Sequence, residues 1–345
     1  MGARRGAVLS RPSARLATPV LGVVLGVVLG VTGCSGSPSV ERQDQRQTAR
    51  PTTTVGGEDR DTGDGEAAVL AAETTVSLPV VPPVPARSAR ELARRLVAAE
   101  TISRDPAADR QAAAQAGFEA QLLYRQLARR PGWVKSVARQ VGPAYRRVVR
   151  LHVKARTSFR AMHHTLSRTL PAWRIVAPAT EAELLAYYRE GEQRYGVPWQ
   201  ALAAINLVET GMGRIRGTSV AGARGPMQFM PATWAQWGEG DIDDPHDAII
   251  AAARYLAHNG GGSGHLDRAL FRYNNSTRYV AGVKAYAAVL TEDPAAFRGF
   301  YDWQIVYLSR RGDVWLPQGY ERRRSTSVGG YLRRHPDRLL SPATG

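Results

Sequence analysis

Cysteine is almost absent from this chain: Cys34 is the single example among 345 residues. One cysteine excludes a disulfide within the chain, so the cellular compartment has to be inferred from targeting signals. It also leaves the adjacent pair His163 and His164 without thiolate partners, and no carboxylate lies near them in the sequence. We therefore do not expect a zinc site at these histidines.

Lysine is scarce as well, since only 3 of the 46 basic residues are lysine. Acidic residues are missing from 135–172, and the net charge of +16 is unevenly spread. Residues 87–172 hold 18 basic and 5 acidic residues, whereas 180–320 hold 13 and 15. A basic segment attracts polyanions through its long-range field. Wall polymers, anionic lipids and nucleic acids are all polyanions of this kind. Because no recognised nucleic-acid motif is present, we expect no nucleic acid partner.

Long apolar runs are also lacking, apart from one near the N-terminus. Val20–Val31 follows several arginines and is too short for a comfortable membrane span. It leads into Cys34 through a Val-Thr-Gly sequence that resembles a bacterial lipobox. We expect residues 1–34 to be a lipoprotein signal peptide, with Cys34 lipidated and N-terminal after cleavage. An ordinary signal peptide with a chance cysteine is the alternative. Either interpretation predicts an exported protein, and the first adds a lipid anchor at the outer face of the membrane.

Two segments of different composition follow the signal. Residues 35–86 are rich in Ser, Thr, Pro, Gly and acidic residues. Such a composition buries too little apolar surface to offset chain entropy, so we expect a disordered linker. In residues 87–172, apolar residues recur at helical spacing between Pro-Gly and Gly-Pro breaks. We expect three or four helices in this basic helical segment. Its charges either form a solvated face or contact an anionic wall polymer or lipid.

The remainder of the chain is organised around 198–210. Pro198 suits the first position of a helix, and apolar residues follow at helical spacing up to Glu209. Ile205 lies one turn before Glu209, so the carboxyl group shares a face with apolar side chains. Desolvation disfavours the charged form of such a group, as a general acid requires. The alternative is a glutamate that is solvated or forms a salt bridge with Arg214.

A glycine-loosened loop comes after this helix. Gly222 and Gly225 frame it, and Gln228 stands between Met227 and Phe229. The amide of Gln228 can both donate and accept hydrogen bonds, which suits recognition of an N-acetyl sugar. The alternative is a tight loop packed by its neighbours, in which Gln228 satisfies the backbone.

Four motifs in order resemble those of Slt-type lytic transglycosylases, relatives of goose-type lysozyme in glycoside hydrolase family 23. The resemblance covers roughly residues 180–320, and its specificity lies in the order and spacing rather than in any single motif. Thr210 stands where the family usually has serine, and Pro226 where it usually has leucine. The motifs are ETGMG at 209–213, GARGPMQFMPATW at 222–234, AAARYL at 251–256 and FRYNNS at 271–276.

The resemblance implies a mainly α, lysozyme-like domain over residues 173–320. It implies cleavage of the β-1,4 bond between N-acetylmuramic acid and N-acetylglucosamine in peptidoglycan. Glu209 would first protonate the glycosidic oxygen, then take the proton of the sugar's 6-hydroxyl so that a 1,6-anhydro ring closes. Most glycosidases need a second carboxylate, but the motifs contain none. In the family the substrate's 2-acetamido group is thought to assist instead. No metal or cofactor is implied.

The resemblance also assigns substrate contacts. Tyr273 would face and orient Glu209, whereas Gln228 and the backbone of its two neighbours would hold the acetamido group and adjoining sugars. Thr210 would position Glu209 or the substrate. The alternative for the FRYNNS motif is a packed tyrosine followed by an asparagine that ends a helix. The predicted substrate-binding residues are Thr210, Met227, Gln228, Phe229, Tyr273 and Asn274.

Two other functions stay open at this point. A true hydrolase would use the same glutamate but deliver water through Asp241, Asp243 or Asp244. A non-catalytic glycan-binding module would keep the fold without the reaction. The acidic loop 239–244 does not match the spacing of an EF-hand, although calcium remains an alternative for it. Asp244 is instead well placed to cap a helix.

The C-terminal part changes character. Residues 304–320 are β-rich around a central Arg-Gly-Asp sequence, which predicts a hairpin. Its Tyr307 and Trp315 would either line a sugar groove or belong to a covering flap. Residues 321–345 form a basic tail, for which we expect little order.

Overall fold

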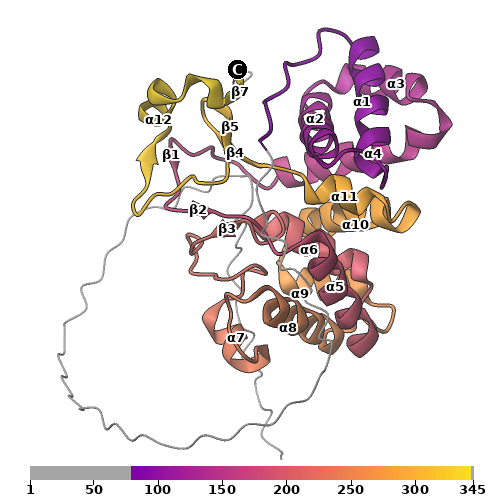
Figure 1. Cartoon of the computed structure of the whole chain (residues 1–345). Coiled ribbons are helices and arrows are strands. Elements are labelled where there is room, and N and C mark those ends of the chain that lie inside the picture. Colours follow the sequence, from indigo (N-terminus) through magenta and orange to yellow (C-terminus); the bar gives the residue numbers. More distant parts are fainter. Residues whose placement is uncertain (1–78, 343–345) are drawn as a thin grey trace, which may run out of the picture.

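The computed structural model describes residues 79–342 (Figure 1). The predicted signal peptide with Cys34 and residues 35–78 of the predicted linker lie outside that range. For residues 79–86 the expectation of disorder is wrong, because the backbones of Val81 and Ala86 bond the side chains of Gln115 and Gln126 and Ala86 is buried. Helices dominate the described residues, and the strands form small antiparallel sheets. The mainly α fold class expected from the sequence is therefore confirmed. None of the helices in 79–342 combines the length and hydrophobicity that a membrane crossing needs.

The basic helical segment contains four helices, which begin and end at local signals. The side chain of Ser88 accepts a hydrogen bond from the Glu91 N–H at the start of the first helix, and Asp109 caps the second in the same way. Gly142, with φ of 77°, separates the third from the fourth. The helices are α1 (Ala89–Arg104), α2 (Arg110–Ala128), α3 (Pro131–Gln140) and α4 (Gly142–Arg160).

Seven further helices follow. Thr180 and Glu183 form the predicted capping box at the start of α5, each side chain bonding the other's backbone N–H. Asp244 caps α8 by accepting from the Asp247 N–H, as the sequence indicated. The helices are α5 (Glu181–Tyr195), α6 (Trp199–Thr210), α7 (Pro231–Trp237), α8 (Pro245–His258), α9 (Leu266–Tyr273), α10 (Thr277–Glu292) and α11 (Ala296–Tyr301).

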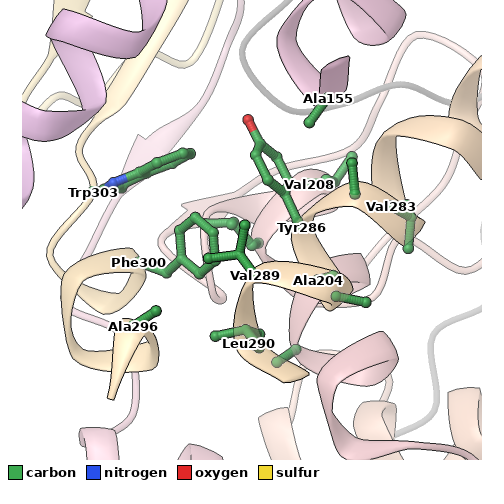
Figure 2. Packing of buried hydrophobic residues seen from close by; sticks show 14 of the residues in the cluster. Ala155, Ala204, Val208, Val283, Tyr286, Val289, Leu290, Ala296, Phe300 and Trp303 are labelled. Carbon is green, nitrogen blue, oxygen red and sulfur yellow. The ribbon is translucent and has the colours of Figure 1, made fainter. Parts of the chain in front are cut away.

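One hydrophobic core joins the basic helical segment to the later helices. Helix α4 packs along α10, and α1 and α2 both contact α11. Gly282 of α10 lies so close to Phe159 of α4 that a Cβ would stand 2.4 Å from the ring. Figure 2 shows this core, with Val208 of α6, Tyr286 of α10 and side chains of α4 and α11 in one cluster. The first four helices are thus packed onto the rest of the fold rather than held apart from it.

The longest strands lie in the C-terminal part of the chain. The predicted hairpin is present as β4 (Ile305–Ser309) and β5 (Gly312–Leu316), and β7 (Leu339–Pro342) extends it on the β5 side. Two short pairs, β1 with β6 and β2 with β3, bring distant segments together. Their bounds are β1 (Thr169–Leu170), β2 (Arg174–Ile175), β3 (Ile215–Arg216) and β6 (Thr326–Ser327).

For this region one of the two alternatives for the hairpin, the sugar groove, is wrong, and so is the expectation of a poorly ordered tail. Tyr307 and Trp315 are buried, Tyr307 against Trp173 and Trp315 against Phe118, so neither ring lines an open sugar groove. The tail is also ordered as far as residue 342. It forms β6, α12 (Val328–Arg334), the 3₁₀ turn Pro336–Arg338 and β7. Tertiary contacts bury apolar residues such as Val328 of this arginine-rich stretch, and local composition does not reveal them.

Candidate active site

The candidate acid, Glu209, lies in the last turn of the most deeply buried helix. Eleven of the 12 residues of α6 are buried, because α5, α8 and α10 pack around it. Gly211 ends the helix in the left-handed conformation, with φ of 60°. A Cβ at Gly211 would stand 2.5 Å from Ile305 Cδ1. Glycine at this position therefore leaves room for the first side chain of β4. Ile305 of the hairpin therefore packs against the end of α6 that carries Glu209.

Burial sets the protonation state of Glu209. The residue is 2% exposed, and its Oε1 accepts a 2.7 Å hydrogen bond from the Tyr279 hydroxyl. Its Oε2 is buried and has no hydrogen-bond partner within residues 79–342. Desolvation raises the pKa of Glu209 to about 8, although the bond from Tyr279 opposes the shift. The carboxyl group is therefore protonated at neutral pH.

The alternative of a Glu209 that is solvated or paired with Arg214 is wrong. The Arg214 guanidinium donates to the carbonyl oxygens of Gly211 and Tyr301 instead. Those two bonds tie the end of α6 to the end of α11. Because the arginine is engaged there, no cationic side chain of residues 79–342 pairs with Glu209, and desolvation prevails.

Tyr279, rather than Tyr273, holds the acid. The predicted partner Tyr273 donates its hydroxyl to the Met227 carbonyl at 2.6 Å. The two tyrosine rings are parallel, with centroids 6.5 Å apart. Ser276 accepts from the Tyr279 N–H and so starts α10, which places Tyr279 in the first turn of a helix that packs on α6. The sequence analysis missed Tyr279, and the signal was a tyrosine in the first turn of the helix after the FRYNNS motif.

Thr210 binds the loop rather than the acid. Its hydroxyl donates to the Pro226 carbonyl and accepts from the Gly213 N–H. Asn206, one turn earlier, donates to the same Pro226 carbonyl at 2.9 Å. These buried bonds fasten the glycine-rich loop to α6. A hydroxyl is the group this role requires, so threonine fills it as well as serine would.

The loop positions Gln228 through unusual backbone angles. Gln228 has φ of 51°, and its Nε2 donates to the Gly225 carbonyl at 3.1 Å, as the packed-loop alternative expected. Gly225 has φ of 76°, and a Cβ there would lie 1.9 Å from the Ile242 carbonyl oxygen. Both the N–H and the carbonyl of Phe229 are paired with Arg224. A sugar contact through the Phe229 backbone therefore stays a prediction and would have to share or replace existing hydrogen bonds.

Asn274, like Glu209, has a buried side-chain oxygen without a hydrogen-bond partner within residues 79–342. It is 4% exposed, its backbone N–H donates to Leu270, and its side-chain Oδ1 has no hydrogen-bond partner in the described part of the chain. Buried acceptors without donors are rare in folded proteins and costly. Among the predicted site residues, Glu209 and Asn274 are the two that retain such acceptors.

The acidic loop has structural partners. Asp243 pairs with Arg224 at 2.8 Å, and Asp241 accepts from the Asp243 N–H. Ligand atoms of Asp244, His246 and Asp247 lie within 4.8 Å of one another, a spacing that a metal ion could bridge. However, Asp244 accepts from the Asp247 N–H at the start of α8, and Asp247 accepts from the Asp241 N–H in the loop before it. The acidic residues of this loop therefore serve to begin α8, with Asp244 as its N-cap.

The fold and the buried acid together define a lysozyme-like domain with one candidate catalytic carboxyl group. Residues 186–293 match the family model of the transglycosylase SLT domain. The match includes Glu209, the glycine-rich loop, Tyr273 and Tyr279, and it supports a lytic transglycosylase that acts on peptidoglycan. Comparison with curated proteins and with solved structures gave no match.

Proposed function

We propose that this protein cleaves the β-1,4 bond between N-acetylmuramic acid and N-acetylglucosamine, leaving 1,6-anhydro-N-acetylmuramic acid ends, in remodelling of the cell wall. The observation that carries the proposal is the state of Glu209. A carboxyl group with a pKa of about 8 is a proton donor at neutral pH. Its position within the match to the transglycosylase SLT domain supports the substrate class.

Glu209 serves both halves of the reaction. Tyr279 holds Oε1, so the proton is available from Oε2. That proton goes to the glycosidic oxygen as the bond to the anomeric carbon breaks, and the substrate's acetamido oxygen stabilises the developing positive charge. The ionised Glu209 then takes the proton of the 6-hydroxyl, whose oxygen closes the anhydro ring. No water is consumed, and Glu209 ends protonated as it began.

The Tyr279 hydroxyl stabilises the charged intermediate state of Glu209. A hydrogen bond to an ionised group is stronger than one to a neutral group, so the 2.7 Å bond strengthens when the proton leaves. Because Glu209 is almost fully buried, the substrate must displace part of its cover before proton transfer. We place Gln228 and Asn274 among the groups that meet the sugar once it enters.

Product chemistry tests the proposal. The protein is incubated with purified peptidoglycan, and the soluble products are identified by mass spectrometry. We expect anhydro-muropeptides, and we expect Glu209→Gln to lower their formation at least ~10²-fold while glycan binding survives. Reducing ends one water heavier would instead establish a hydrolase and make the acids at 241–244 the next targets. Turnover by Glu209→Gln near the wild-type rate would refute the role of Glu209.

The location of the protein is a second part of the proposal. Cys34 is lipidated and becomes the N-terminal residue after cleavage of the signal peptide, and the linker that follows it lifts the folded domain from the outer face of the membrane towards the wall. The support is the sequence before Cys34. Radiolabelled palmitate should enter the wild-type protein and not Cys34→Ser. Equal labelling of both proteins, or of neither, would reject lipidation at Cys34.

The basic helical segment provides a contact with an anionic wall polymer or lipid. Exposed cations on α3 and α4 support this: Lys135, Arg139, Arg146, Arg150 and Lys154 form no ion pair with any residue of 79–342. Charge reversal at Arg146 and Arg150 should weaken sedimentation with anionic vesicles or with purified wall polymer. Unchanged sedimentation with both would reject the contact.

A further inference from the structure

A second feature lies away from Glu209, at the far end of the hairpin. A cavity of about 480 Å³ opens where the β4–β5 turn, the residues before β1 and the start of α12 come together. These elements lie together in Figure 1. Four arginines line the cavity, Arg168, Arg310, Arg311 and Arg333, and its lining contains no acidic residue.

The four guanidinium groups have no carboxylate partner within residues 79–342. The acids of the same region are engaged elsewhere: Asp313 pairs with Arg125 and Arg129, and Asp337 pairs with Arg338. Four like charges around one cavity repel one another. An anion in the cavity would remove that repulsion.

Backbone bonds hold three separate segments in this arrangement. The Arg310 N–H donates to the Ser167 carbonyl, and the Val328 N–H donates to the Arg168 carbonyl, both at 2.9 Å. The β1–β6 pairing adds the contact of Thr169 with Ser327. The arginines therefore project from anchored positions, which lowers the entropic cost of binding.

The Ser167 hydroxyl already donates to the Thr169 carbonyl, whereas the Ser327 hydroxyl accepts from the Gly330 N–H and keeps its own proton. The side-chain donors available for a ligand are therefore the four arginines and the Ser327 hydroxyl. No aromatic ring lines the cavity, so a sugar or base has nothing to stack on. Guanidinium groups present forked donors that match phosphate oxygens, and their number calls for a ligand with more than one charge.

We propose that this cavity binds a phosphate-class oxyanion with at least two negative charges, held by Arg168, Arg310, Arg311 and Arg333. Such an anion could be a free diphosphate or successive phosphates of a polymer, which share this chemistry. The proposal does not depend on the reaction at Glu209.

Calorimetric titration of the full chain tests the proposal, with pyrophosphate as the probe at low salt. We expect saturable binding that Arg311→Gln with Arg333→Gln weakens at least about tenfold. The matched control, Arg323→Gln with Arg324→Gln, removes the same charge from exposed residues outside the cavity and should change the dissociation constant less than about twofold. A second pair, Arg168→Gln with Arg310→Gln, should reproduce the loss.

Two further titrations define the ligand. An oligomer of glycerol phosphate that binds more tightly than pyrophosphate, with the same dependence on Arg311 and Arg333, would identify a polymer as the source. Tighter pyrophosphate binding would identify a free anion. Absence of saturable binding by either probe, equal loss in the control variant, or citrate binding as tight as pyrophosphate would overturn the proposal. Thermal unfolding of each variant verifies that it folds.

Discussion

Replacing the candidate acid should stabilise the protein while destroying its activity. Glu209 has a pKa of about 8 in the folded protein and about 4.5 in the unfolded chain. Between those values the unfolded state loses its proton first, so the folded state binds more protons. The free energy of unfolding therefore falls as pH rises through this window. The contribution of protonated Glu209 is fully present below pH 4.5 and is lost by the time the pH passes 8.

Glutamine at position 209 cannot ionise, so it removes the free-energy cost of keeping Glu209 protonated in the folded protein above pH 4.5. It keeps an oxygen that can accept from Tyr279, and its amide nitrogen takes the place of an Oε2 that already has no partner within 79–342. At pH 7 the gap between the pH and the unfolded pKa corresponds to about 3 kcal/mol of stabilisation relative to glutamate. The difference should be near zero at pH 4 and level off at ~5 kcal/mol above pH 9.

Thermal unfolding from pH 5 to pH 8 measures this difference. We expect the melting temperature of Glu209→Gln to exceed that of the wild type by about 6–10 °C at pH 7, and the gap to shrink towards pH 5. Glu321→Gln, which alters an exposed glutamate, is the matched control and should show no such trend. A gap that does not depend on pH, or a variant less stable at pH 8 than the wild type, would refute the assignment of a buried, protonated Glu209.

Three other predictions concern the surroundings of this acid and the fold that holds it. Tyr279→Phe removes the donor that favours ionised Glu209, so the pKa of Glu209 should rise further, by about 1 unit. The alkaline limb of the pH–rate profile for kcat/KM should move up by the same amount, and an unmoved limb would contradict the role of Tyr279. Asp313→Asn breaks a buried pair with two arginines and should lower the free energy of unfolding by about 3–5 kcal/mol in urea titrations. Those arginines hold the pKa of Asp313 well below its usual value of 3.8, so the wild type should lose this contribution as pH falls through the acid range and the variant should not. Equal acid sensitivity of both proteins would speak against the pair. Gly225→Ala places a Cβ against the Ile242 carbonyl at a positive φ, and should destabilise the loop enough to expose it to limited proteolysis at 25 °C. An unchanged cleavage pattern would show that the loop can relax.

Much of the site could be predicted because its signals are local. The apolar helix ending at Glu209, the capping box at Thr180 and the cap at Asp244 each depend on residues within a turn of one another. The order of the four motifs then indicated the lysozyme-like domain, and the family match over 186–293 agrees with it. Short-range spacing is all these inferences required.

Tertiary packing decided the details that govern the chemistry. The choice of Tyr279 over Tyr273 depends on how α10 crosses α6, and spacing within the motif does not contain that information. The engagement of Arg214 with the end of α11 likewise removed the cation that a sequence-based pairing would have placed beside Glu209.

The sequence by itself determined an apolar helix that ends at Glu209, a glycine-rich loop after it and an uneven distribution of positive charge. Only the folded structure decided that Glu209 is buried and which hydroxyl holds it, that Trp315 is buried rather than open to a sugar, and that Arg168 and three arginines more than 140 residues later surround one cavity. The reason is physical. Capping and helical periodicity act within a few residues, whereas desolvation, ring packing and the meeting of like charges depend on which distant segments the core brings together.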